Sequence, residues 1–183
     1  MAPETYSKAT MPTPFQIRDI RTEEHDTLGR LMCEVYASLP GFPTPAEQPG
    51  YYDMLAHIGR FTDKPATRVL VAVDQHATVL GGIVYFGDMT QYGSGGSATQ
   101  ETHAAGIRLL GVSHAARGQG IGKALTEACI QCAKDQQQQQ VILHTTQAMQ
   151  TAWHLYERLG FTRSPDLDFL QGTLQVYGFR RPL

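Results

Sequence analysis

The chain has 183 residues, of which 42% are hydrophobic, and its formal net charge at pH 7 is −2. This length and apolar content suffice for one domain with a sizeable core. The nearly balanced charge gives no general attraction to nucleic acid or to an anionic membrane, and no apolar run has the length of a membrane span. Neither is therefore an expected partner.

The N-terminal segment and the cysteines indicate where the chain folds and where it resides. Residues 1–14 are polar with scattered prolines and lack the apolar stretch of a secretory signal, so we expect a flexible tail there and a single domain over 15–183. Three cysteines without a disulfide framework favour reduced thiols and a cytoplasmic location. Cys129 and Cys132 fall within a helical pattern and are expected to be small apolar residues, not metal ligands.

The first half of the chain predicts one strand, two helices and a β-hairpin. The helices follow from apolar residues at helical spacing, and the hairpin follows from two β-rich runs joined by a short turn. A segment with four prolines separates the two helices and predicts a stiff loop. The expected elements are a strand at 15–20, helices at 23–38 and 51–61, the loop to residue 50, and strands at 68–73 and 79–86.

The middle of the chain is the most informative stretch. An apolar run at 107–112 predicts a buried strand, and after a short turn an apolar-periodic helix follows at 121–133. The glycines Gly118, Gly120 and Gly122 alternate with other residues where this helix begins. A glycine-rich loop at a helix N-terminus exposes backbone N–H groups and the positive end of the helix dipole, so it predicts an anion site, typically for phosphate.

Two common phosphate loops do not fit this spacing. The Walker A pattern requires Ser or Thr after Gly-Lys, but Lys123 is followed by Ala124. The dinucleotide fingerprint Gly-x-Gly-x-x-Gly would need its third glycine at Lys123. The pattern that fits is Arg-x-x-Gly-x-Gly, formed by Arg117, Gly120 and Gly122.

The second half of the chain completes a mixed α/β pattern. Residues 87–103 are rich in glycine, serine and threonine without periodicity and predict a long functional loop. The following elements alternate strand and helix, which favours helical crossovers over a sheet. They are the strand 107–112, the helix 121–133, a strand at 141–146, a helix at 152–159 ended by Gly160, a short strand near Phe161, and a last strand at 174–179.

Two motifs together resemble one known family. The Arg-x-x-Gly-x-Gly loop resembles the acetyl-CoA motif of the GCN5-related N-acetyltransferase (GNAT) superfamily, and the run Ala-Trp-His-Leu-Tyr-Glu-Arg-Leu-Gly-Phe at 152–161 is similar to its A-x-x-L-Y-E-x-x-G-F signature. The resemblance covers residues 15–179 and implies the GNAT fold, a mixed central sheet with two splayed strands and flanking helices. It also implies that acetyl-CoA enters the gap between strands 107–112 and 141–146.

The resemblance further implies how acetyl-CoA is held. The backbone at 110–112 would pair with the pantetheine arm, and the N–H groups at 118–122 would hold the pyrophosphate. Many family members carry Asn after the second splayed strand, where this chain has Thr-Thr-Gln at 145–147, and Gln147 is the candidate there. The expected cofactor-binding residues are Leu110, Gly111, Val112, Arg117, Gly118, Gln119, Gly120, Ile121, Gly122, Lys123 and Gln147.

Acetyl transfer to an amine sets the requirements for the catalytic groups. The amine must be neutral, the oxyanion needs a donor such as a backbone N–H near Leu110, and the departing thiolate needs a proton or a hydrogen bond. The family resemblance assigns the last role to Tyr156. The resemblance also makes Glu101 the candidate general base, because family members sometimes carry a glutamate just before the central strand, but a solvated loop is the favoured interpretation of Glu101 and His103. No metal is expected.

Three functions remain open from the sequence. An N-acetyltransferase that acetylates a primary amine of a small molecule or peptide by direct attack in a ternary complex is the leading one. A catalytically inactive acyl-CoA-binding or sensing domain is the second, and an unrelated nucleotide-binding domain ranks last, because no carboxylate follows the glycine loop at the expected distance. Acceptor specificity is expected on loops 40–50, 87–103 and 164–172, and a homodimer is left open.

Overall fold

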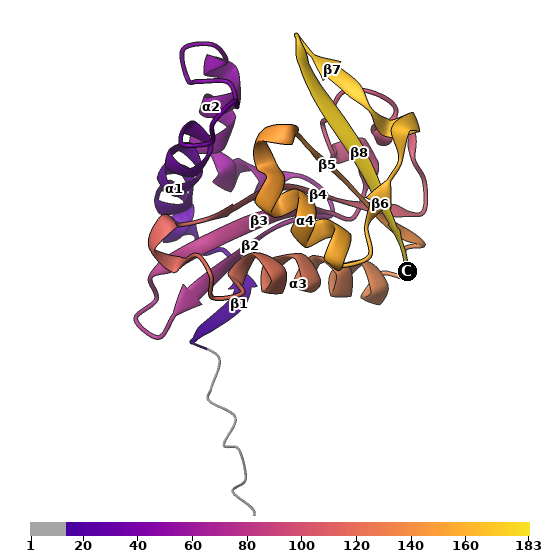
Figure 1. Ribbon diagram of the computed structural model, residues 1–183. Coiled ribbons are helices and arrows are strands. Elements are labelled where there is room, and N and C mark those ends of the chain that lie inside the picture. The colour runs from indigo at the N-terminus through magenta and orange to yellow at the C-terminus, as the bar shows by residue number, and fades with distance from the viewer. Residues whose placement is uncertain (1–13) are drawn as a thin grey trace, which may run out of the picture.

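The computed structural model describes residues 14–183, which build a mixed α/β fold around an eight-stranded sheet (Figure 1). The expected tail at 1–14 lies outside the described residues except for Pro14. The strands are β1 (Phe15–Asp19), β2 (Thr67–Asp74), β3 (Val79–Phe86), β4 (Ala104–Val112), β5 (Gln140–Thr145), β6 (Thr162–Arg163), β7 (Phe169–Gln171) and β8 (Leu174–Pro182). The α-helices are α1 (His25–Ala37), α2 (Pro49–Ala56), α3 (Ile121–Asp135) and α4 (Gln150–Arg158).

The strand order confirms the mixed sheet. The strands lie in the order β1-β2-β3-β4-β5-β8-β6, and β7 pairs with β8. Neighbouring strands are antiparallel except for β4 and β5, which are parallel. This arrangement differs from the doubly wound parallel sheet of a dinucleotide-binding domain, the function ranked last from the sequence.

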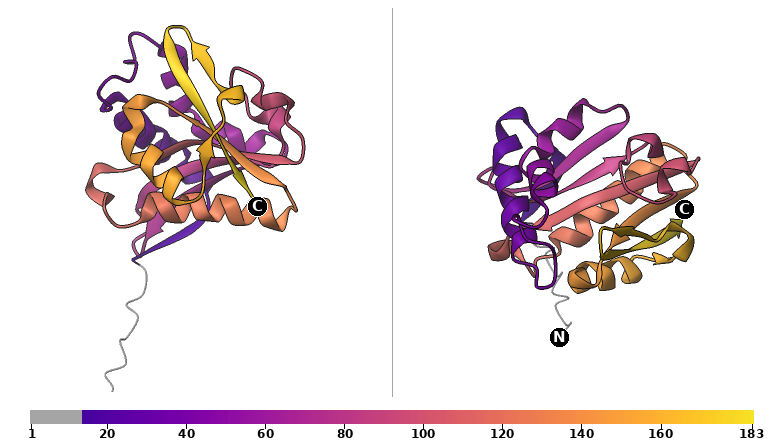
Figure 2. Two further views of the ribbon diagram at one scale, coloured as in Figure 1. Left: turned by 45° about the vertical axis from the view of Figure 1, so that its right-hand side comes forward. Right: turned by 90° about the horizontal axis from the view of Figure 1, so that it is seen from above.

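The central strands are buried on both faces, which explains their nearly continuous apolar sequences. In β2, Val69, Val71 and Val73 belong to the hydrophobic core on the side of α1 and α2, whereas Leu70 and Ala72 belong to the core that includes α3. Alternating strand residues point to opposite faces, so a strand covered by helices on both sides has no polar face. The views of Figure 2 show α1 and α2 apart from α3 and α4.

β4 and β5 separate soon after they begin. Their parallel pairing covers only residues 104–107 and 140–143. Beyond this point Leu109 and Leu110 of β4 together oppose Ile83 of β3, and Leu109 has a φ of +60°. A bulge of this kind bends a strand and strengthens its twist, and here it accompanies the divergence of β4 from β5. The predicted splayed pair is thus confirmed.

Two loop predictions need correction. The segment 164–172, expected to be a loop, contains β7, which forms a hairpin with β8 through Gly172 at a φ of +62°. The loop 87–103 is not without structure, because it contains two short 3-10 turns and buries Met89, Tyr92 and Ala98. In both cases, contacts distant in the sequence order a segment that has no local periodicity.

Two helical glycines make a matched pair for testing the packing of α1 against α2. A Cβ on Gly29 of α1 would lie 2.1 Å from the backbone oxygen of Ala56, whereas a Cβ on Gly50 of α2 would meet nothing within 4 Å. We expect Gly29→Ala to lower the free energy of unfolding by about 1–3 kcal/mol through overpacking. Gly50→Ala should raise it by up to about 0.5–1 kcal/mol, because alanine has less backbone entropy to lose.

Urea denaturation monitored by circular dichroism measures both changes. Equal stability of the Gly29→Ala variant and the unmodified protein would show that α1 and α2 do not approach this closely.

Candidate active site

A cavity of about 890 Å³ opens where β4 and β5 diverge. α1, α3 and α4 and the three loops at 40–50, 87–103 and 164–172 also contribute to its walls. Its size is that of a site for a cofactor or a drug-sized molecule. We call the part lined by residues 117–123 the glycine-loop end, and the part lined by Arg108, Tyr92, His144 and Thr146 the arginine end.

The glycine-loop end presents backbone N–H groups. Gly118 and Gly120 have φ values of +77° and +79°, and a Cβ on either would meet nothing within 4 Å. Among the described residues, no hydrogen-bond acceptor is found for the backbone N–H groups of residues 118–123, and α3 begins within this segment. Unpaired N–H groups at the start of a 15-residue helix make an anion site without any charged side chain.

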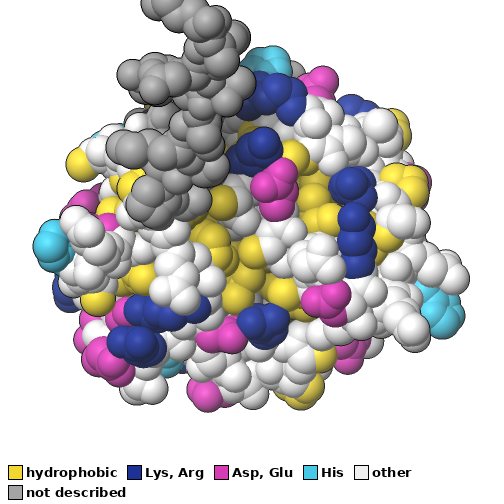
Figure 3. All heavy atoms as spheres, turned by 90° about the horizontal axis from the view of Figure 1, so that it is seen from below, with side chains coloured by type: hydrophobic (Ala, Val, Ile, Leu, Met, Phe, Trp, Pro, Cys, Tyr) yellow, Lys and Arg dark blue, Asp and Glu magenta, His cyan; other side chains and the backbone are white. Residues whose placement is uncertain are grey.

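Basic side chains reinforce this anion site. Arg117, Lys123 and Arg158 line the cavity, and Lys123 forms a loose ion pair with Glu127 at 3.8 Å. Basic and acidic side chains are interspersed on the face drawn in Figure 3. The described residues of that face therefore form no extended basic patch.

The edge of β4 forms the floor of the cavity. Since Ile107 is the last β4 residue paired with β5, the backbone of residues 108–112 has no strand partner on that side. The Leu110 carbonyl accepts a hydrogen bond from the Tyr36 hydroxyl at 3.1 Å. A carbonyl has two lone pairs, so Leu110 can still accept a second hydrogen bond from a ligand.

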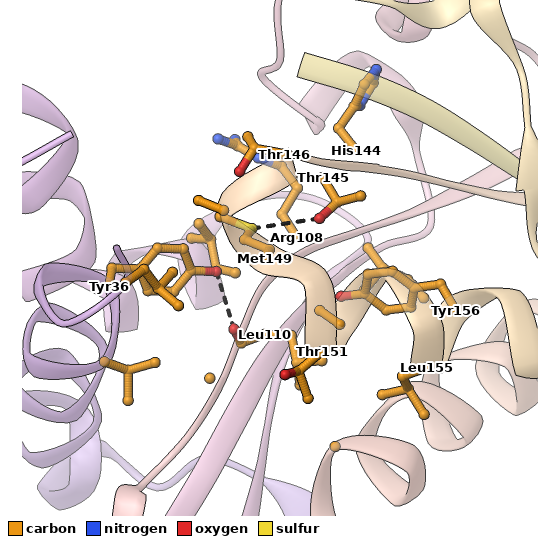
Figure 4. A pocket seen from close by; sticks show the side chains of 18 of the residues that line it. Tyr36, Arg108, Leu110, His144, Thr145, Thr146, Met149, Thr151, Leu155 and Tyr156 are labelled. Atoms are coloured by element: carbon orange, nitrogen blue, oxygen red, sulfur yellow. Dashed lines mark hydrogen bonds between the residues drawn. The ribbon is translucent and has the colours of Figure 1, made fainter. Parts of the chain in front are cut away.

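Tyr156 reaches the cavity from α4. It is 6% exposed, and its ring packs edge-on against Phe161 at 5.8 Å between centroids. Its hydroxyl forms no hydrogen bond with another described residue, and it points into the cavity opposite the hydroxyl of Tyr36 (Figure 4). Burial raises the pKa of Tyr156 well above its ordinary value. The hydroxyl therefore stays protonated at neutral pH and can donate a hydrogen bond or a proton.

The structure brings most of the predicted site residues together. The cavity is lined by Tyr156, Leu110, Gly111, Val112, Arg117, Gly118, Gly120, Ile121, Gly122 and Lys123. Gln119 is exposed and does not line it, and Gln147 is directed to Tyr177, whose hydroxyl accepts from the Gln147 amide at 3.4 Å.

Glu101 lies elsewhere and has a structural partner. Its carboxylate forms an ion pair with Arg180 at 2.7 Å and does not line the cavity. No Asp or Glu is found among the described residues that line the cavity. No group of His, Cys, Asp and Glu side chains among the described residues could hold a metal ion. The candidate base of the sequence analysis is therefore not placed where it could accept a proton from a ligand in the cavity.

The arginine end contains a neutral histidine that links three segments. His144 of β5 bonds to the Tyr92 hydroxyl through Nδ1 and to the Leu167 carbonyl through Nε2, both at 2.8 Å. A carbonyl can only accept, so Nε2 carries the proton and Nδ1 accepts from Tyr92. Burial lowers the pKa of His144, which agrees with a neutral ring whose two nitrogens are both satisfied.

None of the residues of the arginine end is among the candidate site residues of the sequence analysis. Arg108 interrupts an otherwise apolar strand, and this was the one signal available in the sequence. Its guanidinium donates from Nη1 to the Tyr92 carbonyl at 2.9 Å. Thr146 lies just beyond β5 and is 4% exposed. That these residues share one site is seen only in the folded chain, where β4, β5 and the 87–103 loop come together.

Comparison with known proteins places the chain in a family. The family model described as Acetyltransferase (GNAT) family matches residues 32–161. The chain is 36% identical over 103 residues to a mycothiol acetyltransferase of Arthrobacter sp. (strain FB24), which covers 56% of this chain and 29% of that protein. It is 46% identical over 55 residues to N-acetyltransferase 8B of Mus musculus, which covers 30% and 24%. The matches thus span less than a third of the length of these curated relatives.

Solved structures show the same fold. The PaiA N-acetyltransferase of Thermoplasma acidophilum, in complex with coenzyme A, matches with a TM-score of 0.71 at 15% identity, over 92% of this chain and 99% of that chain. No helix in the described part of the chain combines the length and apolarity needed to cross a bilayer. Because the family model covers well over half of the chain, including the glycine loop and Tyr156, the chain belongs to the GNAT acetyltransferase family.

Proposed function

We propose that the chain is an acetyl-CoA-dependent N-acetyltransferase that acetylates a primary amine by direct attack in a ternary complex. One observation carries this proposal: the free edge of β4, the N–H groups of the glycine loop and the Tyr156 hydroxyl all face one cavity. The similar PaiA N-acetyltransferase is in complex with coenzyme A, and a similar Sinorhizobium meliloti phosphinothricin acetyltransferase, with a TM-score of 0.66, is in complex with AcCoA.

The cavity offers a suitable partner for each part of the cosubstrate. The N–H groups of residues 118–123, with Arg117 and Lys123, suit the pyrophosphate. The unpaired edge of residues 108–112 suits an extended pantetheine arm, whose amides can hydrogen-bond to the strand as another strand would. Gln119 and Gln147, which do not line the cavity, are left out of this assignment.

The chain's own groups then support the transfer. The nitrogen of the free amine bonds to the acyl carbon, the carbon–sulfur bond breaks, and the nitrogen releases a proton to water. Backbone N–H groups of the unpaired β4 edge near Leu110 stabilise the oxyanion, and Tyr156 donates to the departing sulfur.

No described feature of the cavity favours an inactive acyl-CoA-binding domain over this reaction. A reducing, cytoplasmic setting is part of the proposal and fits the three free cysteines.

Gly120→Ala tests the site of the cosubstrate against a matched control. Gly120 and Gly41 have φ values of +79° and +81°, and a Cβ on either meets nothing within 4 Å, but Gly41 does not line the cavity. Both alanine variants should lose about 1–2 kcal/mol of stability from the left-handed backbone conformation. In thermal denaturation, CoA should raise the Tm of the Gly41→Ala variant as it does for the unmodified protein, and the rise should be reduced or lost in Gly120→Ala, because the new Cβ occupies space needed by the phosphates.

An equal CoA-induced Tm shift in the two variants would exclude the glycine loop as the phosphate site.

Tyr156→Phe tests the role of the hydroxyl. The variant keeps the ring that packs against Phe161, so we expect little change in stability or in affinity for the cosubstrate. Turnover should fall by about 10²-fold, the low end for general acid catalysis, because a thiolate is a tolerable leaving group and water can substitute. CoA release at saturating acetyl-CoA measures this fall. A purely structural tyrosine would instead show near-normal turnover in Tyr156→Phe and a loss of stability in Tyr156→Ala.

The pH dependence of the rate tests how the amine loses its proton. No Asp or Glu lines the described cavity, and His144 is neutral with both nitrogens engaged, so we expect the acceptor to bind as the free amine. The value of kcat/KM should then rise about tenfold per pH unit until the pKa of the acceptor itself, near 8 for a peptide α-amine and near 10.4 for a lysine side chain. The raised pKa of Tyr156 keeps the acid protonated throughout this range.

A plateau at the same pH for both amines would instead reveal a base on the enzyme, and its disappearance in His144→Gln would identify that base as His144.

A further inference from the structure

The arginine end holds a guanidinium without an acidic partner. Arg108 lies on β4 and lines the cavity, and the Met54 sulfur lies 3.9 Å from its Nη2. Among the described residues, no carboxylate lies within 4.0 Å of it, whereas Arg18, Arg68, Arg163 and Arg180 all form ion pairs. A partly buried cation without a counter-ion is unfavourable, so an anion that binds near Arg108 would be stabilised.

The tyrosines and the histidine around Arg108 do not supply a negative charge. Its positive charge acts to lower the pKa values of Tyr36, Tyr51, Tyr92 and His144, but burial opposes this effect for the tyrosines and leaves the pKa of Tyr51 at about 12. All three tyrosines are therefore neutral at physiological pH, and the neutral His144 adds no negative charge. The carbonyl and the ring of Tyr92, its hydrogen-bond and cation–π partners, carry no net charge, so a ligand is the remaining source of a counter-ion.

The phosphates of the cosubstrate are not suited to this role. The glycine-loop end already supplies N–H groups, Arg117 and Lys123 for them. Arg108 precedes Val112 by four residues of β4, and the glycine loop lies beyond Val112. The two cationic regions therefore serve different parts of the cavity, and Arg108 is left for the acceptor.

Thr146 gives a second, independent indication of a ligand. It lines the cavity beside the end of β5, and its buried Oγ1 has no hydrogen-bond partner among the described residues. An unsatisfied buried hydroxyl is unfavourable, so a ligand that hydrogen-bonds to it would be favoured. Figure 4 shows Arg108 and Thr146 coming from β4 and from the end of β5, the two strands between which the cavity opens. A ligand oxygen there can accept from both.

We propose that Arg108 and Thr146 bind a carboxylate of the acceptor, so that the enzyme acetylates the amine of an amino acid or amino-acid conjugate. This inference rests on the proposed N-acetyltransferase function. An α-amino acid carries its amine and carboxylate on one carbon, so an amine near Leu110 places the carboxylate within reach of an arginine two residues away. A guanidinium matches a planar carboxylate with paired hydrogen bonds.

The rest of the lining favours an apolar amino acid and disfavours polyamines. Phe42, Tyr51, Phe169 and Leu174 contribute apolar surface to the cavity. Several basic and no acidic side chains line its described walls. These basic side chains repel an acceptor that carries additional positive charges. The two acidic residues of loop 164–172, Asp166 and Asp168, are engaged with Arg180 and Arg163 and do not line the cavity.

The test compares acceptors that differ only in the carboxylate. CoA release at saturating acetyl-CoA is measured with L-phenylalanine, L-leucine and L-methionine, with their amides, with 2-phenylethylamine and with spermidine. At a pH where each amine is largely neutral, we expect kcat/KM for an acid to exceed that for its amide by about 10- to 100-fold, the range expected for one charge-assisted pair. In Arg108→Gln this preference should disappear through a higher KM for the acid.

Two further variants separate recognition from general effects. Arg158→Gln removes a cation from the same cavity and should leave the acid-to-amide ratio unchanged. Thr146→Val keeps the shape of the side chain, and should reduce the ratio by about threefold or more without lowering the Tm. A structural role of Thr146 would not move this ratio. A cooperative thermal unfolding transition without CoA shows whether each variant is folded.

Each outcome decides for or against the inference. Amides, 2-phenylethylamine or spermidine acetylated as well as the acids would overturn the carboxylate subsite and leave the proposed function standing. CoA release with a peptide amine but with none of these acceptors would overturn the inference alone, whereas CoA release with no amine of either kind would contradict both. An unchanged acid preference in a folded Arg108→Gln variant would remove Arg108 from recognition. If that variant does not fold, the ratio in the unmodified protein and in Thr146→Val decides.

Discussion

The separation of β4 from β5 is the constraint on which the rest of the site depends. The parallel ladder ends at residues 107 and 143, and the bulge at Leu109 and Leu110 directs β4 away from its neighbour. Leu109 holds a φ of +60°, a conformation that costs a non-glycine residue of order 1–3 kcal/mol. Leu109 is also 5% exposed and lies in the core under α1, so hydrophobic burial can offset this strain. The packing of Leu109 in this core thus supports the conformation in which the β4 backbone leaves β5.

The two ends of the cavity provide positive potential in different ways. At the glycine-loop end it comes chiefly from backbone N–H groups and the start of α3, which are fixed by the fold and suit a multiply charged group. At the arginine end it comes from one side chain, Arg108, held by the Tyr92 carbonyl. One guanidinium neutralises one negative charge, and its planar shape suits a planar anion. This difference assigns a phosphate-bearing cosubstrate to one end and a smaller anion to the other.

Local sequence patterns predicted the part of the site that depends on local structure. The glycine loop and the helix after it are adjacent in the chain, and Tyr156 follows its signature, so their placement in one cavity could be expected from a family resemblance. Glu101 could not be judged in this way, because its partner Arg180 lies 79 residues further along the chain. β7 was missed for a related reason, since it exists as a strand by pairing with β8. Arg108 was visible as a charge in an apolar strand, but its lack of a counter-ion could be known only from the folded arrangement.

His144 connects the segments around the arginine end into one unit. Its ring joins Tyr92 of the 87–103 loop to Leu167 beside β7, and it lies between the rings of Tyr92 and Phe169 at centroid distances of 5.7 and 5.1 Å. Only a neutral imidazole can accept from Tyr92 while donating to Leu167, so protonation would require the Tyr92 hydroxyl to turn from donor to acceptor. The positive charge of Arg108 and the burial of the ring both oppose protonation. The same unpaired guanidinium that suits an acceptor carboxylate therefore also helps to keep in place the histidine that orders the walls around it.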